Sequence, residues 1–158
     1  LTLGGTGARI RAGTIYVVFF ATDFLGPFQS FLVTLGVPLA AWAGIMVADI
    51  CMRKQGFDEV ALFDRNGRYG AFNWPALATM VVASVIGWGL VINQFSSATF
   101  NNWQGYLLEP LHLGKLTADG WTGTWPWANI GVIISLLIGF VGHLVLNWNT
   151  VKKQENRA

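Results

Sequence analysis

The sequence predicts an all-α integral membrane protein with four transmembrane helices. Of its 158 residues, 53% are hydrophobic and only 11% are charged, whereas soluble domains contain roughly 45–50% apolar and about 25% charged residues. Four apolar runs divide the chain, and their borders carry almost all of its Lys and Arg residues. Because the net charge of +2 is spread over these borders, we expect no nucleic-acid partner.

The apolar runs predict spans at about residues 12–26, 28–52, 74–93 and 127–148. The last three have the ~20 residues that an α-helix needs to cross a bilayer. The first run is shorter, but Arg9 and Arg11 at its start can lay their aliphatic stems along apolar surface and lengthen the span. Only a short turn ending at Pro27 separates the first two runs, which favours a tight helical hairpin over the alternative of one long bent helix.

Basic residues predict the orientation of these spans. If the spans alternate in direction, nine of the ten Lys and Arg residues fall on one side, and Lys115 alone falls on the other. Basic residues near span ends are retained in the cytoplasm. Both ends of the chain and the loop 53–73 are therefore predicted to be cytoplasmic, and the loop 94–126 to be extracellular.

Polar residues occur at two points of the apolar runs. Asp49 lies near the predicted cytoplasmic end of the second span, and Arg53 follows one turn later, an order in which acid and base attract each other on a helix. We interpret them as a structural cytoplasmic ion pair, with a role in cytoplasmic gating as the alternative. We interpret His143, deep in the fourth span, as hydrogen-bonded to a neighbouring helix, with a proton relay as the alternative.

Small residues recur every four positions in two spans, which predicts flat faces where helices approach closely. The two stripes are Gly36, Ala40, Gly44 and Ala48, and Gly131, Ser135 and Gly139. Pro38 lacks a backbone N–H and leaves the carbonyl of Thr34 without its helical partner, so we expect a bend there. A packed kink and a gating hinge both fit this pattern.

The sequence lacks the usual patterns of catalytic and metal-binding sites. Cys51 is the only cysteine, and His112 and His143 are the only histidines. No metal-ligand spacing, nucleophile–base pairing or phosphate-binding glycine loop occurs. We therefore expect that the chain is not an enzyme and that it binds neither a metal nor a cofactor.

A series of short motifs runs through the second and third apolar runs and the loop between them. They are Pro38-Leu39, Gly44-Ile45-Met46, Asp49, Arg53-Lys54, Ala61-Leu62-Phe63, Gly67-Arg68-Tyr69, Asn73-Trp74 and Ala76-Leu77. This series resembles the tenth and eleventh helices of the nucleobase:cation symporter-1 family, the purine, cytosine, allantoin and hydantoin permeases. The resemblance extends from Leu1 to about Ile92 and departs from the family at Ile50, where an aromatic residue often follows the acid.

The resemblance implies that the chain is the C-terminal fragment of a twelve-helix transporter with a LeuT-type inverted repeat, which agrees with its start at Leu1 without an initiator Met. It implies secondary active transport of a nucleobase or related heterocycle, such as cytosine, a purine, allantoin or hydantoin, across the plasma membrane. Sodium ions or protons drive such transport. The implied partners are the heterocyclic substrate, the lipid bilayer and the preceding helices of the same protein.

The outer half of the tenth helix is a thin external gate in this family. By position, the candidate gate residues are Phe28, Phe31, Leu32 and Thr34, and the candidate hinge residues are Gly36 and Pro38. The alternative for Phe31 and Leu32 is that they face lipid or a neighbouring helix.

A second interpretation belongs to a different class of protein. The small-residue faces and the lack of carboxylates inside the spans also fit a small four-helix membrane subunit that serves anchoring or assembly and has no transport activity.

Overall fold

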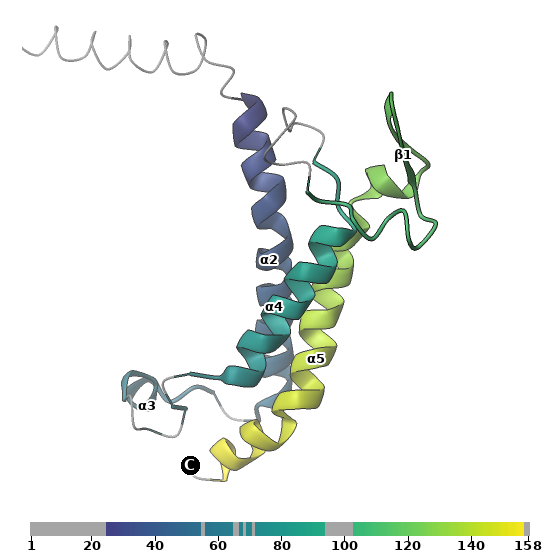
Figure 1. Cartoon of the computed structure of the whole chain (residues 1–158). Helices are drawn as coiled ribbons and strands as arrows, with labels where there is room; N and C mark the ends of the chain where they lie inside the picture. Colours follow the sequence, from purple (N-terminus) through teal and green to yellow (C-terminus); the bar gives the residue numbers. More distant parts are fainter. Residues whose placement is uncertain are drawn as a thin grey trace, which may run out of the picture.

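The computed structural model describes residues 25–54, 56–64, 67, 69–70, 72–93 and 103–156. Three long helices, α2 (Leu25–Met52), α4 (Trp74–Gly89) and α5 (Ile130–Glu155), pack side by side (Figure 1). A short helix α3 (Glu59–Phe63) lies near one end of this bundle. A hairpin of β1 (Lys115–Thr117) and β2 (Gly120–Thr122) lies near the other end, which we call the outer end after the predicted orientation.

The described part of the chain is mostly helical, as predicted, and the short hairpin is an addition that the sequence did not predict. Leu116 pairs with Trp121 in an antiparallel register that closes at Gly120, whose φ of 115° suits glycine. Residues 28–52 and 130–155 form helices long and apolar enough to cross a membrane, and α4 is a shorter apolar helix. The first predicted span, 12–26, lies outside the described residues except for its last two.

Helix α2 begins at Leu25, three residues before the predicted start of the second span. Residues 25–27 therefore form the first turn of a helix and not a turn between two helices. Pro27 is tolerated there because the first N–H groups of a helix have no intrahelical partner. The helix then continues without a break through Pro38 to Met52.

Helix α4 begins at Trp74, where the Asn73 side chain accepts a hydrogen bond from the N–H of Ala76. It ends at Gly89, four residues before the predicted end at 93. The carbonyls of Trp88 and Gly89 accept hydrogen bonds from the N–H groups of Gly105 and Leu107. Residues 103–113, which we call the outer segment, therefore supply the donors that the next helical turn would have supplied. Non-helical backbone of this kind is tolerated near a membrane where protein buries it, and residues 90–92 are buried.

Helix α5 begins at Ile130, three residues later than predicted, because Trp125–Ala128 form a 3₁₀ turn in which Pro126 is buried. It continues seven residues beyond the predicted end at 148. Lys152 and Lys153 in its last turn interact favourably with the negative end of the helix dipole.

Helices α2 and α5 touch backbone to backbone. A Cβ atom added at Gly44 would collide with the Leu136 carbonyl, and one added at Gly139 would collide with the Ala41 carbonyl. The predicted stripe on α5 is buried, and it extends further than predicted to His143, Asn147 and Val151. On α2 the predicted stripe is buried at Gly44 and Ala48, but further out the buried residues are Val37 and Ala41, each one position beyond Gly36 and Ala40.

Candidate functional site

The outer half of α2 has two chemically different faces. Phe28, Phe31 and Leu32, three of the four predicted gate residues, point away from α4 and α5, with 58% of Phe31 and 49% of Leu32 exposed. Ser30 is fully buried, and Thr34 forms hydrogen bonds on that buried side. Thr34 is thus placed on the opposite face from the three bulky residues.

Five polar residues tie this buried face to its neighbours, and we call them the outer clasp: Ser30, Thr34, Trp88, Asn93 and Gln104. The Asn93 amide donates to the Ser30 hydroxyl at 2.7 Å, and the Gln104 amide donates to the Thr34 hydroxyl at 3.0 Å. Gln104 is 5% exposed, and its Oε1 has no partner within the described part of the chain. The clasp thus joins α2 to the segments that follow α4.

A residue of the clasp also supplies the hydrogen-bond donor that Pro38 lacks. The Thr34 carbonyl, which loses its helical donor to the proline, accepts a hydrogen bond from the indole Nε1 of Trp88 at 2.8 Å. Trp103 packs edge-on against the Trp88 ring, with 5.3 Å between the ring centroids. A neighbouring helix therefore satisfies the freed carbonyl. The sequence predicted the orphaned carbonyl but not its donor.

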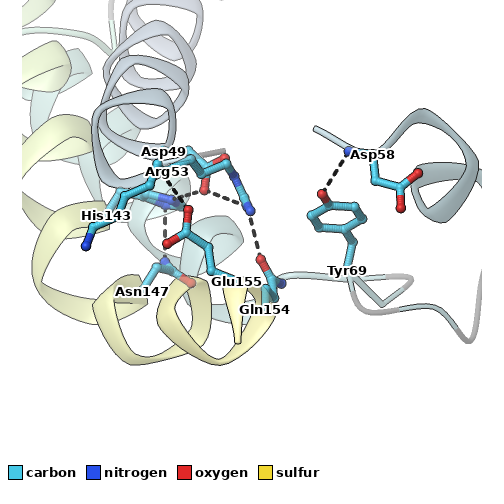
Figure 2. Close-up of polar contacts among 9 residues, drawn as sticks. Asp49, Arg53, Asp58, Tyr69, His143, Asn147, Gln154 and Glu155 are labelled. Atoms are coloured by element: carbon cyan, nitrogen blue, oxygen red, sulfur yellow. Dashed lines mark hydrogen bonds and ion pairs between the residues drawn. The ribbon is translucent and has the colours of Figure 1, made fainter. Parts of the chain in front are cut away.

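The inner end of α2 carries a second polar group of residues, the inner cluster: Asp49, Arg53, His143, Asn147 and Gln154 (Figure 2). Arg53 Nε donates to Asp49 Oδ2 at 2.7 Å, and a guanidinium nitrogen donates to Oδ1 at 3.1 Å. The same nitrogen donates to the Gln154 side chain at 3.0 Å. The sequence pair Asp49 and Arg53 is thus a two-pronged ion pair that also reaches α5.

His143 extends this cluster across the helix contact. Its Nε2 lies 3.3 Å from Asp49 Oδ1, and its Nδ1 lies 3.1 Å from the Asn147 amide nitrogen. With Nε2 protonated and Nδ1 accepting from Asn147, a neutral imidazole fits both contacts. The predicted hydrogen bond from His143 to a neighbouring helix is therefore present, and its partner is the predicted ion pair, which the sequence did not indicate.

The loop after α2 packs onto the same arginine. The guanidinium carbon of Arg53 lies 4.6 Å from the centre of the Phe57 ring and 5.2 Å from that of Tyr69, distances typical of cation–π contacts. The Tyr69 hydroxyl accepts a hydrogen bond from the N–H of Asp58, which caps α3. The sequence missed these contacts because Arg53 and Phe57 lie in the loop beyond the end of α2, where helical spacing gives no guide, and Tyr69 is distant along the chain.

These two groups of residues can hold or release helices. The outer clasp consists of neutral hydrogen bonds, and the inner cluster combines one acid, one base and one imidazole already paired with each other. Among the described residues, no three His, Cys, Asp or Glu side chains come close enough to hold a metal ion. Their chemistry is that of helix positioning.

Comparison with known proteins identifies one family. A family model described as permease for cytosine/purines, uracil, thiamine and allantoin matches residues 10–109. This range includes α2, α4 and all five residues of the outer clasp. Neither curated proteins nor solved structures yield a match.

Replacing Trp88 by Phe should loosen the outer half of α2. The variant keeps an aromatic ring but leaves the Thr34 carbonyl without a donor, and losing such a bond costs about 1–2 kcal/mol. Hydrogen exchange followed by mass spectrometry should show faster exchange in peptides covering residues 28–37. Trp127→Phe, at a half-exposed position in the 3₁₀ turn Trp125–Ala128, is the control, and equal exchange in both variants would contradict the assignment.

Replacing Asp49 by Ala should destabilise the protein more than replacing Asp49 and Arg53 together. The single variant leaves a mostly buried guanidinium unpaired, whereas the double variant removes both charges. Unfolding by SDS titration in detergent micelles, with Arg53→Ala completing the cycle, should give a coupling energy of at least about 1 kcal/mol. Strictly additive losses would show that the pair contributes nothing.

Proposed function

The chain belongs to the family of permeases for cytosine/purines, uracil, thiamine and allantoin, and we propose that it works in cation-coupled uptake of a nucleobase or related heterocycle. The match confirms the resemblance to the nucleobase:cation symporter family. The protein is accordingly a membrane transport protein and not an enzyme. The family match favours transport over the alternative of an anchoring or assembly subunit.

We propose that preceding helices of a LeuT-type transporter supply the substrate site and the site for a sodium ion or proton. The part of the chain described by the structure contributes the external gate and its support. Its charges fit the proposed orientation. Arg53 and Lys54 follow the end of α2, and Lys152 and Lys153 lie in the last turn of α5, whereas Lys115 is in the hairpin at the other end of the bundle. The described inner end is the cytoplasmic end in this proposal.

The two-faced outer half of α2 is the observation that carries the gate assignment. Phe28, Phe31 and Leu32 present bulky apolar groups on the face that neither α4 nor α5 covers. In our proposal this face closes over bound substrate. Closure bends α2 near Gly36 and Pro38, where a glycine without close neighbours adjoins a turn weakened by the proline.

The buried face of the same segment supports this role. Hydrogen bonds join Ser30 and Thr34 to the segments that follow α4. A hydrogen bond contributes only about 0.5–1.5 kcal/mol net, so the clasp can fix the open position of the segment and still release it. Release would leave Ser30 and Thr34 to bond within their own helix, as Thr34 already does to the Ser30 carbonyl.

Uptake by cells that express the intact transporter tests the proposed function. Radiolabelled cytosine, uracil, adenine, hypoxanthine, allantoin and hydantoin are offered with sodium, without sodium, and after collapse of the proton gradient. We expect concentrative uptake of at least one compound that disappears with one of the two ion gradients. Uptake that persists without either gradient would refute symport.

Replacing Phe31 and Leu32 together by Ala should weaken uptake about thirtyfold if each bulky residue contributes ~1 kcal/mol to occlusion, ~2 kcal/mol for the pair. Leu137→Ala, which truncates an exposed residue of α5, is the control. Surface labelling should confirm equal amounts of protein in the membrane. Transport as fast as that of the control would remove the gate assignment without affecting the family's transport function.

A further inference from the structure

We propose that the inner ends of α2 and α5 form a binding site for the headgroup of an anionic phospholipid. A cavity of about 500 Å³ opens there, and we call it the basic pocket. Its walls are Met52 and Lys54 from the end of α2 and Trp148, Val151, Lys152, Glu155 and Asn156 from the end of α5. None of these residues belongs to the outer clasp or to the inner cluster.

Helical geometry explains why these residues converge. Trp148, Lys152 and Glu155 follow one another at spacings of four and three residues, so they share one face of α5. Lys153 is the next residue along the chain, but it does not line the cavity. The last residues of α2 then close this face from the side.

The charge of the basic pocket suits a phosphodiester. It contains two ammonium groups, of Lys54 and Lys152, and one carboxylate, of Glu155. Within the ranges that the structure describes, neither lysine forms an ion pair. The Glu155 carboxylate instead accepts a hydrogen bond from the backbone N–H of Lys54, which fastens the two walls together. The remaining charge of +1 matches the single negative charge of a phosphatidylglycerol headgroup.

An apolar track leads from the pocket along the membrane face of α5. Trp148, at the rim, is 55% exposed, and tryptophan favours the headgroup level of a bilayer. Val145 and Val141 lie on the same face toward the middle of the helix and are also exposed, at 72% and 53%. A lipid whose phosphate lies between the lysines can therefore place an acyl chain along these side chains. A soluble phosphate compound would leave this track unused, so the combination favours a lipid.

Lipid binding by the purified intact transporter tests this site. Native mass spectrometry in detergent is used to follow retention of palmitoyl-oleoyl phosphatidylglycerol, with palmitoyl-oleoyl phosphatidylcholine as the neutral comparison. Since each basic residue near an anionic membrane contributes ~1 kcal/mol, Lys54→Gln and Lys152→Gln should each weaken phosphatidylglycerol retention about fivefold. Lys153→Gln makes the same charge change one residue away and should leave retention unchanged, and Lys152→Arg should preserve it.

Three results would overturn the proposal. Equal losses in Lys152→Gln and Lys153→Gln would indicate diffuse attraction to basic residues. Equal retention of phosphatidylcholine would show that the phosphate charge is not recognised. Displacement of phosphatidylglycerol by inorganic phosphate would identify a soluble ligand in place of a lipid. All of these readouts are independent of transport, so failure here leaves the proposed function untouched.

Discussion

The contact between α2 and α5 is the constraint on which the rest of the structure depends. In a membrane, apolar side chains gain little by leaving lipid for protein, so helices associate through close packing and hydrogen bonds. Gly44 and Gly139 bring the two backbones together, and Ser135 on α5 can then donate to the Val37 carbonyl at 3.1 Å. A larger side chain at either glycine would separate the helices and pull apart His143 and Asp49 as well.

Polar groups along α2 find partners both within the helix and on neighbouring elements, and these partners differ between its two ends. At the outer end, uncharged side chains meet a helix that a proline has weakened. At the inner end, a charged pair is surrounded by an imidazole, an amide and two aromatic rings. The inner end is therefore the fixed support, and the outer end is the part from which movement can be obtained at low energetic cost.

The sequence predicted those features that depend on local spacing. Asp49 and Arg53 stand one turn apart, and the missing N–H of Pro38 identifies the Thr34 carbonyl. Partners from other helices were beyond such reasoning, because nothing in the spacing of Trp88 or His143 indicates which residue each faces. The end of α4 differs from the prediction for the same reason. N–H groups of the outer segment donate to its last carbonyls, and this segment is close to them in space but not in sequence. The alternation that reveals a hairpin was hidden in strands of three residues.

The early end of α4 leaves the bundle with helices of unequal reach. Its 16 residues extend only ~24 Å at 1.5 Å per residue, less than the ~30 Å of hydrocarbon in a typical bilayer. Helices α2 and α5, with 28 and 26 residues, exceed that thickness. Acyl chains beside α4 must therefore either shorten locally or meet the exposed side chains of the segment that follows it, such as Trp103, Tyr106 and Leu111. A change in bilayer thickness would therefore act mainly at the outer end of α4, next to the residues Asn93 and Gln104 that bond to α2.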